Sequence, residues 1–170
     1  MTHLKDTPGV ASEAPAQTTG FTFNHSMLRI KDTKVSLDFY TRVLGMQLVR
    51  SEHFDEHKFS LYFLAFEDPE TLPETKPERK AQIARFSGVL ELTHNHGTED
   101  DSNFSYHSGN EEPKGFGHIC MSVPNLDAAI EWFDTNEVTY QKRPEDGFMN
   151  DIAFIKDPDG YWIEIISQTV

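Results

Sequence analysis

Two histidines and two glutamates recur at matching places in the two halves of this sequence. His25 and His118 each lie in a β-like segment, and Glu91 and Glu164 each lie between aliphatic residues of another. A carboxylate inside so apolar a strand is costly to bury unless it is paired or bound to a metal. Together the four side chains make a set of two nitrogens and two oxygens, which suits zinc, nickel, iron or manganese. A single strand histidine is more often a hydrogen-bonded core residue, so the recurrence carries the metal hypothesis.

The recurrence extends to the segments around these residues. The shift that superimposes the two histidines also brings Asp32 onto Asn125 and residues 39–40 (Phe-Tyr) onto residues 132–133 (Trp-Phe). Each half therefore has a strand, a helix-capping residue, a helix with an aromatic pair, and a last strand with a central acid. Weak identity with a consistent pattern is typical of an old internal duplication.

Local patterns predict the elements that must position the four residues. Helices are expected at about 34–44 and 126–136, behind the caps Asp32 and Asn125. A further short helix is expected at 81–86. Strands are expected at 21–30, 46–51, 59–66, 89–95, 118–123, 152–156 and 161–166. Because side chains alternate along a strand, Glu91 should face away from Leu90 and Leu92, and Glu164 should share a face with Trp162.

The predicted fold class is α+β, with two βαβββ modules related by duplication. We expect a flexible arm at 1–20, the first module at 21–97, an acidic loop at 98–114 and the second module at 115–170. The first module is the longer because of an insertion at about 67–87. Prolines at positions 69, 73 and 77 predict that most of this insertion is a surface excursion outside the core.

Composition excludes several classes of partner. The 170 residues suit one domain of ordinary size. With 28 acidic and 15 basic residues, the net charge of -13 argues against nucleic acid and against an anionic membrane surface. No apolar run is long enough to span a bilayer, and residues 1–20 lack the apolar stretch of a secretory signal. Cys120 is the only cysteine, so we expect no intrachain disulfide, a small buried thiol and a cytoplasmic location.

Four blocks of the sequence resemble the glyoxalase I family of the vicinal-oxygen-chelate superfamily, and the resemblance covers about residues 21–168. The blocks are residues 25–32 (His-Ser-Met-Leu-Arg-Ile-Lys-Asp) with 36–46; 59–65 with 91–95 (Glu-Leu-Thr-His-Asn); 115–118 (Gly-Phe-Gly-His); and 153–165, which contains Asp-Pro-Asp-Gly-Tyr-Trp. The resemblance implies curved mixed sheets in a homodimer whose active sites are shared between subunits. It also implies the metal ligands His25, Glu91, His118 and Glu164. The insertion and the 98–114 loop resemble the longer, zinc-dependent branch, so Zn²⁺ is expected, with Ni²⁺ as the alternative.

The resemblance further implies a lyase that isomerises the hemithioacetal of methylglyoxal and glutathione to S-D-lactoylglutathione. Glutathione is then a co-substrate, and no redox cofactor is needed. A carboxylate moves a proton between two carbons while the metal stabilises an enediolate. Glu164 is the expected base, and Glu91 is expected to serve the other hemithioacetal enantiomer.

Residues that hold the substrate are also implied by the resemblance. Glutathione contacts are expected at Arg29, Asn95, Lys114 and Lys142. Many relatives have arginine where this chain has Lys114. A lysine should still pair with a carboxylate there, but with less of the two-point contact that arginine makes. The apolar wall around the thioether and the reacting carbons is expected to comprise Phe54, Leu61, Phe63, Met149, Ile152, Phe154 and Trp162.

Two other functions fit the same fold. An Fe(II)-dependent extradiol dioxygenase would use two histidines and one carboxylate, which leaves the fourth ligand and the basic residues unexplained. A drug-binding or toxin-binding protein without activity would use the groove alone, which leaves both His and Glu pairs unexplained.

Overall fold

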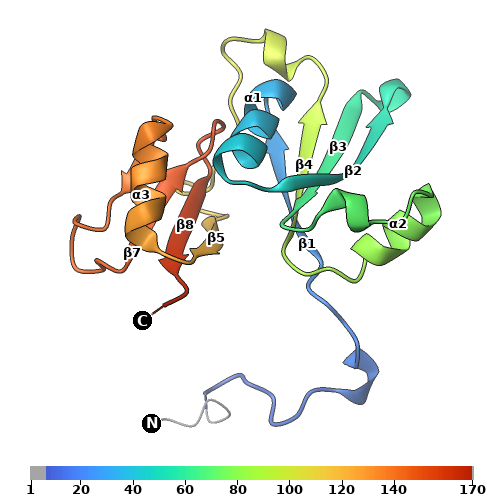
Figure 1. Cartoon of the computed structure of the whole chain (residues 1–170), viewed down its shortest axis with the longest axis horizontal. Coiled ribbons are helices and arrows are strands. Elements are labelled where there is room, and N and C mark those ends of the chain that lie inside the picture. Colours follow the sequence, from blue (N-terminus) through green and yellow to red (C-terminus); the bar gives the residue numbers. More distant parts are fainter. Residues whose placement is uncertain (1–6, 170) are drawn as a thin grey trace.

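Two four-stranded mixed sheets stand side by side in the structure, a computed structural model that describes residues 7–169 (Figure 1). The first sheet has the order β1-β4-β3-β2 and the second the order β5-β8-β7-β6. In each sheet the first strand pairs in parallel with the last, and the other pairs are antiparallel. The strands are β1 (His25–Ile30), β2 (Gln47–Phe54), β3 (Phe59–Ala65), β4 (Val89–Asn95), β5 (His118–Val123), β6 (Tyr140–Lys142), β7 (Ile152–Lys156) and β8 (Trp162–Ser167). The α+β class and its repeated βαβββ order are confirmed.

The two module helices begin where the sequence predicts. Before α1 (Thr33–Asp38), the Asp32 carboxylate accepts hydrogen bonds from the backbone amides of residues 34 and 35. Before α3 (Leu126–Thr135), the Asn125 side chain accepts from the amide of residue 128. After Asp38 the first helix changes from α-helical to π-helical hydrogen bonding, and the π-helical turn covers Phe39–Val43. Gly45 follows at a φ of 77°, a left-handed conformation that suits glycine at the end of a helix.

The insertion contributes to the core, which corrects the prediction that its proline-rich part is only a surface excursion. Leu72 is 5% exposed and Ile83 is 3% exposed, and both belong to a cluster of buried hydrophobic residues with Val49 and Val89. The insertion forms η5 (Pro69–Thr71) and α2 (Lys76–Ile83). The helix starts before the expected position 81 because Pro77 lies in its first turn, where proline favours a helix.

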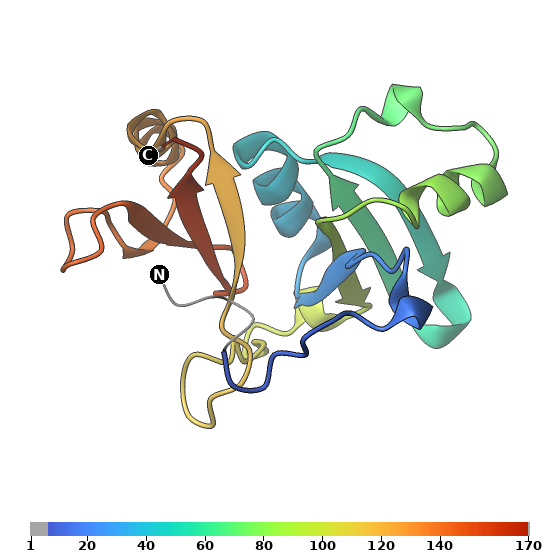
Figure 2. The same cartoon turned by 90° about the horizontal axis from the view of Figure 1, so that it is seen from below.

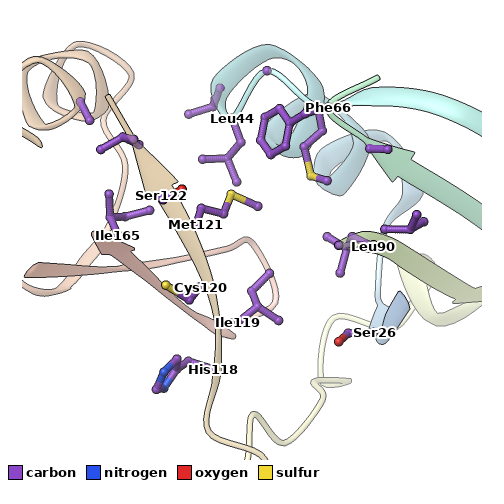
Figure 3. Close-up of a pocket in the computed structure, with 18 of the residues that line it drawn as sticks. Ser26, Leu44, Phe66, Leu90, His118, Ile119, Cys120, Met121, Ser122 and Ile165 are labelled. Atoms are coloured by element: carbon purple, nitrogen blue, oxygen red, sulfur yellow. The ribbon is translucent and has the colours of Figure 1, made fainter. Parts of the chain in front are cut away.

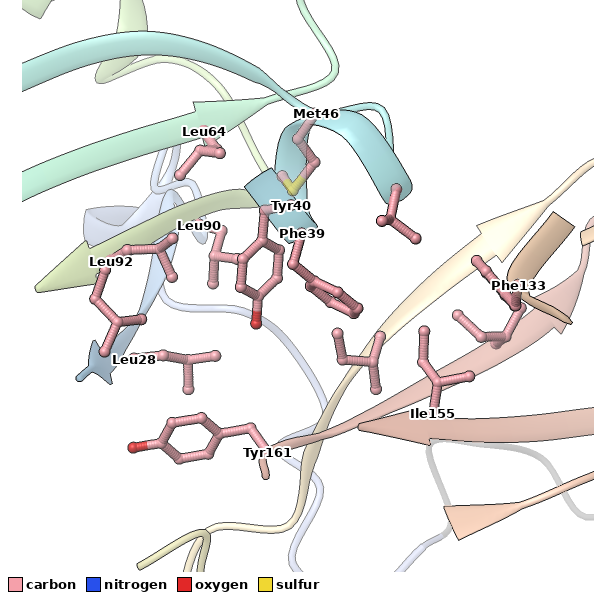
Figure 4. Close-up of a cluster of buried hydrophobic side chains, with 14 of the residues drawn as sticks. Leu28, Phe39, Tyr40, Met46, Leu64, Leu90, Leu92, Phe133, Ile155 and Tyr161 are labelled. Carbon is pink, nitrogen blue, oxygen red and sulfur yellow. The ribbon is translucent and has the colours of Figure 1, made fainter. Parts of the chain in front are cut away.

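The main core is shared by both modules. Figure 4 shows Phe39 and Tyr40 between the first sheet and Ile155 of the second. The Tyr40 side chain is fully buried, and its hydroxyl donates a 2.8 Å hydrogen bond to Oδ2 of Asp157 in the turn between β7 and β8. Asp159, in the same turn, accepts from the amide of Lys31 and the hydroxyl of Ser36. These contacts fix the second module against the first within one chain.

Shorter segments complete the described chain. β6 was not among the strands expected from local patterns, because its three residues give no measurable alternation. The remaining turns of 3-10 helix are η2 (Ala16–Thr18), η4 (Asp55–His57) and η6 (Thr98–Asp100). Residues 7–20 are exposed and extend below both sheets in Figure 1, and Figure 2 shows β5 on the side of its sheet that faces the first module. Within residues 7–169, no helix has the length and apolar character needed to cross a membrane.

Candidate metal and substrate site

His25 and Glu91 form a pair on neighbouring strands of the first sheet. The distance from Nε2 of His25 to Oε2 of Glu91 is 3.1 Å, and the glutamate side chain is 14% exposed. The other ring nitrogen, Nδ1, lies 2.8 Å from Oδ1 of Asn24. Asn24 in turn donates to the backbone carbonyls of Ile83 and Phe86 in the insertion. Such a partner on the far ring nitrogen fixes the orientation of a ligand histidine.

His118 and Glu164 form the equivalent pair in the second sheet. Their Nε2 and Oε2 atoms are 3.3 Å apart. The Phe154 ring lies edge-on to the His118 ring, with centroids 5.2 Å apart. Cys120 is exposed and pairs with Glu164 across the strands, which corrects its expected role as a buried filler. Partial burial, together with a hydrogen bond to Glu164, raises the pKa of the Cys120 thiol to about 11.

Each pair fits the requirements of a divalent transition metal. Two ligand atoms at about 2.1 Å from an ion lie roughly 3.0 Å apart at a right angle and roughly 3.4 Å apart at the tetrahedral angle. The separations of 3.1 and 3.3 Å fall in that interval. Imidazole nitrogen and carboxylate oxygen are also the donor types that zinc and nickel accept. Each pair therefore has the chemistry and spacing of half a metal site.

The two pairs do not meet in a single chain. Over residues 7–169, no group of three or more His, Cys, Asp and Glu side chains is placed to hold a metal. Between the modules lies a largely apolar groove of about 1170 Å³. Figure 3 shows Ile119 and Met121 on the groove side of β5, whereas His118 and Cys120 point the other way. The structure thus presents two half-sites, one on each sheet.

The substrate residues expected in the first module gather on the face of Glu91. Nη1 of Arg29 donates a 2.8 Å hydrogen bond to Oδ1 of Asn95. Phe63 pairs with Glu91 across the strands, and Leu61 pairs with Thr93, so both share the glutamate's face. Phe54 stacks on Phe59 at the end of the same sheet, with ring centroids 4.7 Å apart. An exposed cation beside an apolar wall suits a ligand with one charged end and one apolar end.

The substrate residues expected in the second module divide into two groups. Ile152, Phe154 and Trp162 lie on the face of Glu164, as the register of β7 and β8 requires. Lys142 points its ammonium at the backbone carbonyls of residues 143, 149 and 152, which uses all three of its protons and holds the segment that contains Met149. The Lys114 side chain is 73% exposed, and its ammonium is 4.0 Å from Glu112.

Sequence reasoning missed three residues beside this site. Asn24 has no signal of its own, because its role depends on the fold of the insertion. Tyr106, in the acidic loop, places its hydroxyl 3.4 Å from Oδ1 of Asn95. Lys156 pairs with Trp162 and so shares the face of Glu164, which strict alternation along β7 could have predicted. His94, in contrast, is buried on the opposite face of β4, where its ring pairs with Glu99.

Comparison with known proteins identifies the family of this chain. Residues 22–165 match the family model for the glyoxalase/bleomycin resistance protein/dioxygenase superfamily. A lactoylglutathione lyase of Pseudomonas putida is 56% identical over 169 residues, which cover 99% of this chain and 98% of that protein. A lactoylglutathione lyase of Pseudomonas aeruginosa is 52% identical and covers 96% of this chain and 92% of its own length.

A solved structure has the same architecture. The trypanothione-dependent glyoxalase I of Leishmania major superimposes with a TM-score of 0.64, at 30% identity, over 87% of each chain. The family match spans both half-sites, from the strand of His25 to the strand of Glu164. The chain therefore belongs to the glyoxalase/bleomycin resistance protein/dioxygenase superfamily.

Proposed function

We propose that this chain is a lactoylglutathione lyase, which isomerises the hemithioacetal of methylglyoxal and glutathione to S-D-lactoylglutathione. The observation that carries the proposal is the pair of His–Glu half-sites at equivalent positions of two duplicated sheets. The two Pseudomonas relatives, both lactoylglutathione lyases, support it through identity above 50% over nearly the whole chain. A cytoplasmic location belongs to the proposal, because glutathione keeps thiols such as Cys120 reduced there.

A homodimer completes the proposed site. One chain holds two half-sites on different sheets, and a two-fold axis can bring the first sheet of one subunit against the second sheet of its partner. Because such an interface is isologous, it would form two identical four-ligand sites at once. Large apolar side chains that one chain leaves exposed, including Phe66 (63%), Trp132 (46%) and Phe116 (42%), give that interface apolar surface to cover.

His25, Glu91, His118 and Glu164 are the residues that would hold the metal, which we propose is Zn²⁺, with Ni²⁺ as the alternative. A divalent ion held there supplies Lewis acidity, which makes the adjacent carbon-bound proton of the substrate more acidic. Asn24 and Thr93 orient the first pair, since Thr93 donates a 3.3 Å hydrogen bond to Glu91. The residues present therefore fit an ion with mixed nitrogen and oxygen ligands.

Glu164 is the proposed base that moves the proton. Its side chain is 22% exposed and lies on an apolar face with Phe154 and Trp162, which limits the access of competing water. A carboxylate in this position can take the proton from one carbon and return it to the next, so no net proton is exchanged with the protein. Glu91, on the opposite half-site, is proposed to do the same for the other enantiomer.

Arg29 and Asn95 are proposed to hold a carboxylate of glutathione. The guanidinium is bidentate by nature and is positioned by its hydrogen bond to Asn95. Lys114 is proposed as a second, more mobile cation, and Lys142 is proposed to act through the segment that its ammonium holds. Leu61, Phe63, Phe54, Met149 and Ile152 complete the proposed apolar wall.

The proposal is tested by the isomerisation assay on chelated protein, followed by addition of Zn²⁺ and Ni²⁺ in parallel. The formation of the thioester is followed by its ultraviolet absorbance. We expect no turnover after chelation and recovery with metal, with Zn²⁺ restoring the higher rate. A folded dimer that stays inactive with both metals would contradict the proposal, and oxygen uptake with a catechol would favour a dioxygenase instead.

A further inference from the structure

Four basic residues occur from position 114 to the end of the sequence, and three of them are already engaged or solvated. Lys142 binds three backbone carbonyls, Arg143 pairs with Asp134, and Lys114 extends into solvent. Lys156 differs from all three. In the part of the chain that the structure describes, its ammonium has no hydrogen-bond or ion-pair partner, although the residue is half-buried. The half-buried stem holds this lysine on the sheet, so its ammonium is available to an anionic ligand.

Lys156 lies in a polar cavity of about 390 Å³ beside the second half-site. The cavity lies between residues 105–111 of the acidic loop and the β7–β8 hairpin. Groups that can donate hydrogen bonds line it together with the lysine, among them Ser108, Asn110 and Gln141. Its two acids do not neutralise the lysine: Glu111 is exposed, and the Asp159 carboxylate already accepts from Lys31 and Ser36.

The register places Lys156 on the face and in the row of the second half-site. Trp162 pairs with His118 on one side and with Lys156 on the other, so the three residues form one row across β5, β8 and β7. Strands in a sheet are about 4.8 Å apart, so the backbones of Lys156 and His118 are roughly 10 Å apart. A tripeptide conjugate with its reacting end at the half-site can span that distance with one of its charged ends.

We propose that Lys156 binds a carboxylate of the glutathione moiety and so determines specificity for the peptide thiol. The inference rests on the proposed function and adds a residue to it. A carboxylate fits because an ammonium forms its strongest hydrogen bonds with anionic oxygens, and the surrounding amides and hydroxyls can donate to the same group. A local cation is also needed because a protein of net charge -13 repels an anionic ligand at long range.

The test compares Lys156→Met with Lys156→Arg in the metal-loaded protein. Methionine keeps an unbranched stem without the charge, whereas arginine keeps the charge. Lys80→Met, on the exposed side of α2, is the control for the loss of one positive charge. By titration calorimetry with S-hexylglutathione, we expect Lys156→Met to weaken binding about tenfold, and Lys156→Arg and Lys80→Met to change it less than threefold. In turnover, Lys156→Met should raise KM with kcat nearly unchanged, because the lysine does not touch the reacting carbons.

Two ligand variants identify the carboxylate. One is S-hexylglutathione with its glycine carboxylate esterified, and the other lacks the α-carboxylate of the γ-glutamyl residue. The ligand without the partner group should bind the natural protein and Lys156→Met equally well. An unchanged affinity for S-hexylglutathione in Lys156→Met, or a tenfold difference that persists with both variants, would overturn the inference. Isomerisation by the natural protein separates these outcomes from a failure of the proposed function, which would abolish turnover in every variant.

Discussion

The two modules share a strand order but hold their histidines differently. In the first module, Nδ1 of His25 is bound to Asn24, and Asn24 is in turn tied to the insertion through the carbonyls of Ile83 and Phe86. In the second module, the residue before His118 is Gly117, which has no side chain to take this role. An edge-on aromatic ring is common to both histidines, Phe63 against His25 and Phe154 against His118. The repeat thus kept the ligands and their aromatic neighbours, whereas the hydrogen-bonding partner of the histidine diverged.

The aromatic pairs of the two helices diverged in a related way. Tyr40 reaches across to Asp157, whereas the equivalent Phe133 has no hydroxyl. Trp132 donates its indole N–H to the carbonyl of Val43, whereas the equivalent Phe39 has no donor. Each aromatic pair therefore makes one polar contact across the junction, and neither contact is repeated in the other pair. The modules therefore differ in the side chains that join them to each other and to the insertion, whereas the strand order of their sheets is the same.

The largest expected effect concerns whether one chain can complete a site. His25→Ala and His118→Ala should each abolish turnover, because every four-ligand site then loses one nitrogen. When the two variants are refolded together, mixed dimers should contain one intact site and one site that lacks both histidines. A random mixture should recover about a quarter of the natural activity, since half of the dimers are mixed and each has one working site.

The double variant, with both substitutions in one chain, is the control for this experiment. Mixed with the natural protein, it should give dimers in which each site lacks one histidine, and no activity beyond that of the natural dimers. If each chain completed its own site, the mixture of single variants would stay inactive. Activity of the refolded mixture therefore decides between a shared site and a self-contained one.

The next effect separates the two glutamates. Glu164→Gln should lower kcat at least a hundredfold, which corresponds to about 2.7 kcal/mol, because an amide cannot carry the proton. Glu91→Gln should lower it less and mainly for one hemithioacetal enantiomer, which progress curves on the racemic substrate would reveal. Both variants should remain dimeric by size-exclusion chromatography. Near-normal turnover in Glu164→Gln would remove this residue from the role of base.

Elements that depend on local sequence were predictable. The caps Asp32 and Asn125, the strand of Glu91 and the strand of His118 all occur where the patterns place them, because capping and alternation act over a few residues. The repeat showed one histidine and one glutamate in each module. Their proximity comes from the parallel pairing of the first and last strands, which the sequence analysis did not predict.

Features that depend on distant contacts were not predictable. The burial of Leu72 requires the first sheet to offer it a surface, and a proline-rich segment gives no sign of that. Lys142 is engaged because three carbonyls of a later segment fold around it. The separation of the half-sites in one chain depends on how the two sheets are placed. Such features belong to packing between elements, where local propensity has no influence.

A smaller effect concerns Asp157, which accepts the hydrogen bond that Tyr40 of the first module makes across the junction. Burial, helped by the nearby Asp159, outweighs the hydrogen bonds from Tyr40 and the Tyr161 amide, and the net result raises the pKa of Asp157 from 3.8 to about 6. The native state then binds the proton more tightly than the unfolded state does. This stabilisation is complete below about pH 4 and is lost as the pH rises through 6, a change of about 3 kcal/mol.

Asp157→Asn isolates this effect from the other carboxylates, because asparagine has the same shape and does not titrate. Urea unfolding between pH 4 and 7 should show the natural protein losing about 3 kcal/mol relative to the variant. Tyr40→Phe should extend the decline to higher pH, because it removes a hydrogen bond that favours the charged carboxylate. A constant difference between the natural protein and Asp157→Asn would show that Asp157 titrates normally.

The smallest effect tests the asymmetry between the two histidines. Asn24→Ala removes the acceptor on Nδ1 of His25 and should weaken metal binding about tenfold, the lower end of the range for groups that orient a ligand histidine. Asn24→Asp keeps an acceptor oxygen and should restore most of the affinity, as competition with a chromogenic chelator would show. Gly117→Ala is the matched change before His118, where no partner exists to be lost. If it weakened binding as much as Asn24→Ala, both histidines would depend equally on the preceding residue, and the modules would hold their ligands alike after all.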